Sequence, residues 1–357
     1  MPVTRMDQIE TPALLVDMDV LEANIRKMAA YFRGKRAKLR PHYKTHKSPA
    51  IAHMQMAEGA KGITCAKLGE AQTLAEAGIR DILIANQIAD SQKIDRLAGL
   101  AKNVKMTVCV DNAQNIKELS LAAAAHGSTI YALVEVEVGM QRCGVNSKEE
   151  ALSLARQVSA SKGLVFEGLQ AYAGQLSHIP EHEARVKGTG EAEMQVLKVR
   201  NYLESNGFNV NEVSGAGTGT YNIPGDKEIW TEIQAGSYVF MDTDYIKLDL
   251  GFETALTVLA SVIHKRHGYA ITDAGLKVCC QENGPPALRG LPGLQVLALS
   301  EEHGKIQDAK NELKYLQKVE YIPSHCCATV NLHDYYHCVR GGLLEAVWPV
   351  SGRGKSR

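Results

Sequence analysis

The sequence predicts an α/β protein in which a closed (β/α)8 barrel of the TIM type is followed by an antiparallel β domain. Two observations predict this architecture. Over about 200 residues, short apolar segments alternate with amphipathic segments of helical periodicity, as in barrels. After about Asp249 the segments become short and mostly β-rich, and Gly and Pro punctuate them, which is typical of antiparallel strands joined by turns.

The barrel prediction depends on eight segments with the apolar character of buried parallel strands. Helical segments fall between most of them, and the seventh gap, around residues 221–230, lacks a convincing helix. An open doubly wound sheet is the alternative, but the candidate site residues recur after strands around the whole series, which favours a closed barrel. The predicted strands are Ala37–Tyr43, Gly62–Ala66, Asp81–Ala85, Lys105–Val110, Tyr131–Val138, Val165–Tyr172, Glu212–Gly217 and Glu232–Tyr238. The predicted helices are Ser48–Ala57, Leu68–Ala77, Ser91–Leu100, Ala113–Ala125, Lys148–Ser159 and Glu181–Ser205.

The domain boundaries follow from this division. We place the barrel at residues 20–248, and the β domain at residues 1–19 together with residues 249–357. The segment Thr11–Asp19 has the character of a buried strand but precedes the first helix, Val20–Tyr31, and has no place among the eight. We therefore expect this strand to join the β domain.

Composition excludes several classes of function. Lys+Arg and Asp+Glu both total 40, so the net charge is zero and nothing favours binding to nucleic acid or a membrane surface. No apolar run approaches the roughly 20 residues of a transmembrane helix, and the N-terminal residues have no secretory or transit pattern. We therefore expect a cytoplasmic protein. The eight cysteines are expected to be core, catalytic or metal-bound thiols rather than disulfides.

The segment RPHYKTHK, residues 40–47, contains the first candidate for chemistry. Lys44 comes just past a predicted strand, where parallel α/β folds build their sites. Arg40, Lys47 and His46 are close to it in sequence, and neighbouring positive charge lowers the pKa of a lysine, which favours the neutral amine that attacks a carbonyl. The alternative is a solvated basic loop.

Two turns rich in glycine and hydroxyl groups predict a phosphate site. SGAGTGT, residues 214–220, follows the seventh strand, and QAGSY, residues 234–238, follows the eighth. Barrels often bind phosphate in the loops after these strands, through backbone N–H groups that glycine leaves accessible. With a lysine at the same barrel mouth, this pattern suggests pyridoxal phosphate. The predicted phosphate-binding residues are Gly217, Thr218, Gly236, Ser237 and Tyr238.

Seven motifs in one order give the sequence a specific resemblance. They are RPHYKTHK, VGMQRCGV, GLQAYAG, VSGAGTGTY, TDAGLK, LSEEHG and PSHCCATVNLHD. Together they resemble the D-threonine aldolase, 3-hydroxyaspartate aldolase and D-serine dehydratase family, over nearly the whole chain. These are fold type III pyridoxal-phosphate enzymes with the alanine-racemase type of fold.

The resemblance assigns roles to five residues. It implies that Lys44 binds the cofactor covalently and that Arg142 donates to the cofactor's ring oxygen. Tyr172 would line the ring, and His178 would be the base near the substrate hydroxyl. Gln234 stands where alanine racemases have an arginine facing the pyridine nitrogen; a neutral group there is expected to leave that nitrogen less strongly protonated. Asp273 and His303 are family landmarks without a derived role.

The segment His325-Cys326-Cys327 is the candidate metal site. In an extended segment, residues i and i+2 point to the same side, so His325 and Cys327 could bind one ion while Cys326 faces away. In the family that this chain resembles, an H-x-C or H-x-D pair holds a divalent ion. A thiolate favours zinc over manganese or magnesium.

The resemblance implies a metal-dependent lyase acting on D-β-hydroxy-α-amino acids. The first prediction is an aldolase of the D-threonine type, which releases glycine and an aldehyde. The alternative is a dehydratase acting on D-serine or 3-hydroxyaspartate, and a non-catalytic pyridoxal-phosphate-binding barrel is a third reading. We expect a homodimer and a small-molecule substrate.

Overall fold

The computed structural model describes residues 4–223 and 229–357. The chain divides into two compact units, each with its own sheet. We call residues 28–44, 51–236 and 354–357 the barrel unit, and residues 1–27, 45–50 and 237–353 the β unit. The predicted gap without a helix, at residues 221–230, lies partly outside the described residues.

The barrel unit contains a parallel sheet that closes on itself, so the predicted barrel is confirmed. Within the described residues its eight strands run in the order β2-β9-β8-β7-β6-β5-β4-β3. The two ends of this order meet just after β2, where Lys61 N donates to Leu39 O and Thr64 N donates to Pro41 O. The strands are β2 (Lys38–Leu39), β3 (Ile63–Cys65), β4 (Asp81–Ile84), β5 (Lys105–Val110), β6 (Ile130–Glu135), β7 (Leu164–Ala171), β8 (Glu212–Gly215) and β9 (Glu232–Ile233).

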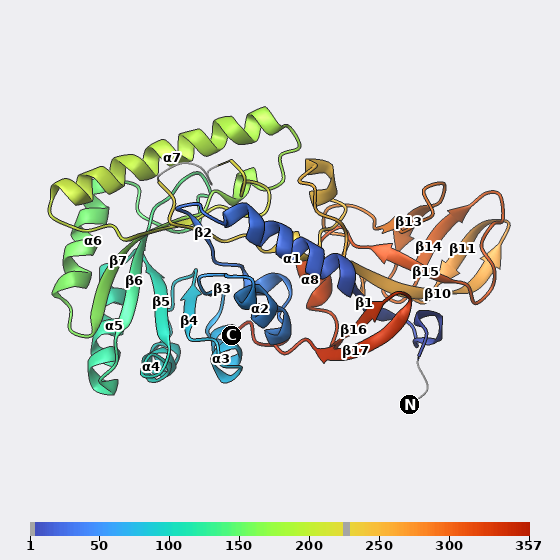
Figure 1. The fold of residues 1–357 in the computed structure, drawn as a ribbon, viewed down its shortest axis with the longest axis horizontal. Helices are drawn as coiled ribbons and strands as arrows, with labels where there is room; N and C mark the ends of the chain where they lie inside the picture. Colours follow the sequence, from blue (N-terminus) through green and yellow to red (C-terminus); the bar gives the residue numbers. More distant parts are fainter. Residues whose placement is uncertain (1–3, 224–228) are drawn as a thin grey trace. The chain divides into compact units, whose positions relative to one another are not determined.

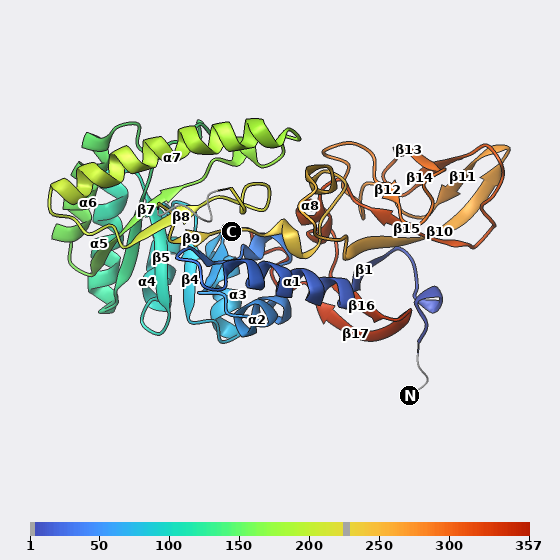
Figure 2. The same cartoon turned by 45° about the horizontal axis from the view of Figure 1, so that its top comes forward.

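Helices lie along the outer side of this sheet, as α4, α5 and α6 show in Figures 1 and 2. Polar side chains define where they begin: Asp90, Asn112 and Ser147 accept hydrogen bonds from backbone N–H groups in the first turns of α4, α5 and α6. The helices are α1 (Met18–Phe32), α2 (Pro49–Ala57), α3 (Leu68–Glu76), α4 (Ser91–Leu100), α5 (Ala113–His126), α6 (Lys148–Ala160) and α7 (His182–Ser205).

The first and last barrel strands are shorter than predicted. β2 and β9 have two residues each, because the chain then turns into 3-10 helices at Tyr43–Thr45 and Ser237–Val239. Lys44 therefore lies in a tight turn, with the fully buried Tyr43 before it.

Seven charged side chains form what we call the ionic layer, at the amino-terminal end of the barrel strands. Arg40 donates to Glu232 and to Asp81, both at 2.8 Å, and its side chain is 3% exposed. Lys61 contacts Glu212 and Glu232, and Lys105 pairs with Glu167 at 2.7 Å. Gly62 leaves room for this layer, since a Cβ atom there would lie 2.3 Å from Arg40 Nη1.

The β unit contains a mostly antiparallel sheet. β1 (Ala13–Asp17) pairs with β10 and with β16, so the first strand joins this sheet, as predicted. The β1–β16 pair is parallel, which the sequence did not predict. The other elements are β10 (Leu256–Arg266), β11 (Gly268–Thr272), β12 (Ala287–Leu288), β13 (Gln295–Leu299), β14 (Gly304–Asp308), β15 (Lys318–Ile322), α8 (Cys326–Val330), β16 (Tyr335–Arg340) and β17 (Leu343–Pro349).

Candidate functional site

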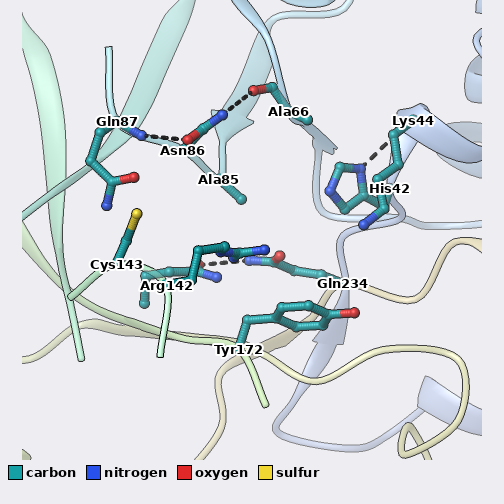
Figure 3. Close-up of a pocket in the computed structure, with 11 residues that line it drawn as sticks. His42, Lys44, Ala66, Ala85, Asn86, Gln87, Arg142, Cys143, Tyr172 and Gln234 are labelled. Atoms are coloured by element: carbon teal, nitrogen blue, oxygen red, sulfur yellow. Dashed lines mark hydrogen bonds between the residues drawn. The ribbon is translucent and has the colours of Figure 1, made fainter. Parts of the chain in front are cut away.

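A cavity of about 310 Å³ opens at the carboxyl ends of the barrel strands. Four of the predicted site residues line it together: Lys44 after β2, Arg142 after β6, Tyr172 after β7 and Gln234 after β9 (Figure 3). Their convergence follows from the parallel barrel, which brings all strand carboxyl ends to one rim. The cavity is lined by His42, Lys44, Ala66, Ala85, Asn86, Gln87, Arg142, Cys143, Gln170, Tyr172 and Gln234.

Several polar members of this lining were not predicted from the sequence. Asn86 and Gln87 directly follow β4, and Gln170 is the penultimate residue of β7. Asn86 donates to the carbonyl of Ala66, which fixes its side chain across the ends of two neighbouring strands. Only their positions could have identified these residues from the sequence, because they are polar residues at the carboxyl ends of predicted barrel strands.

The cluster of cations around Lys44 does not have the arrangement that the sequence suggested. Arg40 is four residues before Lys44, but its side chain is bound in the ionic layer by Glu232 and Asp81. Its charge is therefore neutralised locally by these two carboxylates. Lys44 itself lines the cavity, with its Nζ atom 5.6 Å from the centre of the Tyr172 ring.

Arg142 is held in the site through its backbone. The carboxylate of Glu137, two residues past β6, accepts hydrogen bonds from the backbone N–H groups of residues 139–142. Partial burial opposes ionisation, but these bonds outweigh it and lower the pKa of Glu137. The Arg142 guanidinium lies 5.8 Å from the Tyr172 ring centre and 3.9 Å from Glu135, and half of its side chain is exposed. It is thus positioned beside the cavity without a close ion pair to Glu135.

Gln234 makes two short hydrogen bonds at the floor of the cavity. Its Nε2 atom lies 2.7 Å from Gln170 Oε1 and 2.7 Å from Ser214 Oγ. Ser214 in turn interacts with Glu232 of the ionic layer. Burial would raise the pKa of Glu232, but Arg40 and Lys61 lower it below its usual range, so the carboxylate is ionised.

The two predicted phosphate-binding turns meet within the barrel unit. Gly236 N donates to Thr218 Oγ1 at 3.2 Å, and Gly217 N donates to Thr220 Oγ1 at 3.3 Å. Gly219 is required by this packing, since a Cβ atom there would lie 2.1 Å from the Ser177 carbonyl oxygen. Ser237 and Tyr238, the other two predicted residues, belong to the β unit.

His178 lies in the exposed loop after β7 and is not among the residues that line the cavity. The buried Arg185 of α7 holds this loop, because its Nη1 atom donates to the carbonyls of Ile179 and Pro180 at 2.6 and 2.9 Å. The proposed base is thus followed by a fixed segment of backbone.

The metal candidates lie in the β unit, and their local geometry differs from the prediction. The segment is not extended: Cys326 begins the short helix α8, and His325 precedes it with extended dihedral angles. A five-residue helix is too short to leave a periodic pattern in the sequence. His325 and Cys327 still face each other, since their interaction is the main cause that raises the pKa of His325 to about 9.

The side chains around this pair define its donor set. His325 Nδ1 lies 2.6 Å from Glu282 Oε2, and Cys327 Sγ lies 3.3 Å from Thr45 Oγ1 and 3.7 Å from Ser237 Oγ. Cys326 is fully buried and contacts Cys327, so it does not simply face away. Among the described residues, no three His, Cys, Asp or Glu side chains are arranged to hold a metal ion. Two ligands of this kind would leave the other positions of an ion to water or substrate.

A parallel barrel with a lysine, an arginine and two hydroxyl-rich turns at its mouth is the arrangement expected of a pyridoxal-phosphate enzyme of the alanine-racemase fold. The sequence matches the family described as alanine racemase, N-terminal domain, over residues 16–244, and a putative serine dehydratase domain over residues 255–339. The cavity residues fit such a cofactor, because Lys44 has an amine of the kind that binds an aldehyde carbon and Arg142 has donors of the kind that bind an oxygen.

Individual relatives show which enzymes of this fold the chain is similar to. The chain is 41% identical to a 3-hydroxy-D-aspartate aldolase of Paracoccus denitrificans (strain Pd 1222), over 98% of this chain and 93% of that protein. It is 40% identical to a D-threonine aldolase of an Arthrobacter species, over 98% and 94% of the two chains. The crystal structure of D-threonine aldolase from Filomicrobium marinum matches with a TM-score of 0.96, at 37% identity and 99% coverage of both chains. The chain therefore belongs to the D-threonine aldolase, 3-hydroxyaspartate aldolase and D-serine dehydratase family of pyridoxal-phosphate-dependent lyases.

No helix in the described part of the chain combines the length and apolarity needed to cross a membrane. None of the eight cysteines, all of which lie among the described residues, forms a disulfide.

Proposed function

We propose that this protein is a metal-activated aldolase that cleaves D-β-hydroxy-α-amino acids of the D-threonine type to glycine and an aldehyde. The observation that carries the proposal is the identity of about 40% to two aldolases over nearly the whole chain, together with Lys44 and Arg142 in one cavity. The substrate has an amine, a carboxylate and a β-hydroxyl group, so the site must bind the first two and remove a proton from the third.

The cofactor supplies an electron sink for the electrons of the broken Cα–Cβ bond. Lys44 would hold the cofactor covalently through its side-chain amine. Arg142 donates to the cofactor's ring oxygen, and Tyr172 lines the ring. The turns at Gly217–Thr218 and 236–238 bind its phosphate.

His178 accepts the proton of the β-hydroxyl group as the carbon–oxygen bond becomes the carbonyl of the leaving aldehyde. Protonation of Cα, which yields glycine, would balance the proton lost from the β-hydroxyl group. A neutral hydroxyl group is a poor proton donor to histidine near pH 7. A divalent ion held by His325 and Cys327 would supply a Lewis acid that lowers the pKa of the substrate's β-hydroxyl group.

A dehydratase of the same family is the second candidate, and Cys327 favours it. A thiolate selects a soft ion such as zinc over manganese or magnesium, and such an ion suits withdrawal of hydroxide from the substrate. Product analysis with D-threonine and D-serine separates the two functions. Glycine plus acetaldehyde supports the aldolase, whereas ammonia plus a 2-keto acid supports the dehydratase.

The metal role has its own test. Chelation should abolish turnover and leave the visible absorption of the bound cofactor unchanged. Cys327→Asp should retain activity and shift the preference towards manganese or magnesium, because carboxylate is a harder ligand than thiolate. Full activity of the chelated enzyme on D-threonine would contradict the role.

We also propose a cytoplasmic homodimer, which fractionation and light scattering would test.

A further inference from the structure

The amide of Gln234 has one orientation relative to the cavity, and its neighbours determine it. Gln234 lines the cavity directly after β9. Its Nε2 atom is within 2.7 Å of two oxygens, Gln170 Oε1 and Ser214 Oγ. A primary amide has two N–H bonds, so both hydrogens are used within the protein. The atom left for a bound molecule is the carbonyl oxygen, Oε1.

The ionic layer fixes this orientation through Ser214. Arg40 Nε lies 2.8 Å from Glu232 Oε2 and Lys61 Nζ lies 3.2 Å from it, so Glu232 is an anion that can only accept hydrogen bonds. The Ser214 hydroxyl therefore directs its proton to Glu232, and its oxygen is left to accept from Gln234.

The inverted amide is disfavoured by the same neighbours. It would place Gln234 Oε1 2.7 Å from the side-chain oxygen Oε1 of Gln170 and 2.7 Å from Ser214 Oγ, whose proton is already donated to Glu232. Two acceptors at that separation repel each other, and both would lose a partner in a buried position. The described residues offer Gln234 Oε1 no hydrogen-bond donor of their own.

A carbonyl oxygen that faces the cavity requires a donor on the cofactor. The phosphate of pyridoxal phosphate only accepts, Lys44 takes the aldehyde carbon, and Arg142 is itself a donor for the ring oxygen. The remaining polar atom is the ring nitrogen, which donates only when it is protonated. We propose that Glu232, through Ser214, turns the carbonyl oxygen of Gln234 towards the cavity and thereby selects the cofactor with a protonated ring nitrogen.

This inference deepens the proposed function and rests on its cofactor. It reverses the expectation that a neutral residue at this position leaves the nitrogen less strongly protonated. Neutrality is not decisive, because the hydrogen-bonding polarity of the amide sets which form of the cofactor is bound. A protonated ring withdraws electrons more strongly, which suits cleavage of a carbon–carbon bond.

The test measures the ring nitrogen in the resting holoenzyme, reconstituted with cofactor that carries ¹⁵N in the ring. The wild-type nitrogen should give the signal of the protonated form at pH 7. Gln234→Glu keeps an acceptor and should keep this signal, whereas Gln234→Arg presents only donors and should shift it to that of the neutral form. Ser214→Ala removes the constraint on the amide and should lower the pKa of the ring nitrogen.

Gln87→Leu is the matched control, because Gln87 lines the same cavity but does not contact Gln234, Ser214 or Glu232. In this variant the signal of the cofactor's ring nitrogen should not move. A neutral nitrogen in the wild type, or an unchanged signal in Gln234→Arg, would overturn the inference. The measurement needs no substrate. Failure of the chain to bind the cofactor would instead refute the proposed function, so the two failures are distinguishable.

Discussion

The two ends of the barrel both carry charged side chains, but they use them differently. At the amino-terminal ends of the strands, Arg40 and Glu232 are almost fully buried and are bonded to each other at 2.8 Å. At the carboxyl ends, Lys44 and Arg142 face a cavity, and Arg142 is half exposed. Arg40 and Lys44 are only four residues apart in the sequence. The role of a charged side chain therefore depends on which end of the barrel it occupies, and not on its neighbours in the sequence. At the amino-terminal end the charge stabilises the fold, and at the carboxyl end it is available to bind and react.

The largest expected effect is at the open end. Lys44→Ala should reduce turnover to background and remove the yellow colour of the covalently bound cofactor, because among the described residues only Lys44 brings a side-chain amine into the cavity lining. Borohydride reduction of the wild type, followed by peptide mapping, should find the cofactor on Lys44. A label on Lys47 or another lysine would contradict the assignment.

Arg40→Met tests whether the buried ion pairs at the amino-terminal end of the barrel stabilise the fold. It leaves the buried carboxylate of Glu232 with Lys61 as its cation, so the free energy of unfolding should fall by about 3–5 kcal/mol, as for other broken buried pairs. Urea unfolding measures this. Arg5→Ala is the matched control, since Arg5 is bonded to Asp7 at 3.1 Å with both side chains exposed, and should change stability little. Equal losses in the two variants would remove the distinction between the two ends.

The pH dependence of stability should also show the effect of Arg40 on the buried carboxylate of Glu232. Burial opposes ionisation of Glu232, but Arg40 and Lys61 lower its folded pKa below that of the unfolded chain. Its contribution to stability is therefore complete above the unfolded value of about 4.3 and is lost as the pH falls towards the folded value. Unfolding midpoints of the wild type should drop across this window. In Arg40→Met the drop should be smaller, because the pKa of Glu232 is no longer lowered as far.

The smallest expected effect concerns the loop that carries Arg142. Glu137→Ala removes the acceptor of the backbone N–H groups of residues 139–142, so the Arg142 side chain should lose its fixed position. Cofactor affinity should fall about 10-fold, which corresponds to about 1.4 kcal/mol. Cofactor titration followed by absorbance measures this. Glu149→Ala, beside the same loop but without contact to it, should bind normally; equal weakening would show a general disturbance of this surface.

The sequence predicted the barrel because apolar strands and helices of regular length leave strong periodic patterns. The resemblance of its motifs to a known family predicted that Lys44, Arg142, Tyr172 and Gln234 belong to one site. All four line one cavity, because residues after parallel strands meet at one rim. The sequence could not predict which charges near Lys44 are neutralised, because Glu232 and Asp81 approach Arg40 only in the folded barrel.

Two further differences have local physical causes. The helix at Cys326–Val330 is too short for periodicity to reveal, so the segment with His325 was expected to be extended. The orientation of Gln234 depends on Ser214, which is 20 residues away in the chain, and through it on Glu232. Hydrogen-bond polarity of this kind is a property of a network and leaves no motif in the sequence.

The position of β1 has a consequence for how the protein is made. Ala13 pairs with Leu259 and Val16 pairs with Cys338, so a strand synthesised before the barrel sequence finds its partner strands only after that sequence. At usual translation rates the delay is on the order of tens of seconds. The ribosome completes the whole barrel sequence in that time, while the apolar segment Ala13–Val16 has no partner strand. A chaperone that shields this segment on the nascent chain would therefore be expected to raise the yield of folded protein.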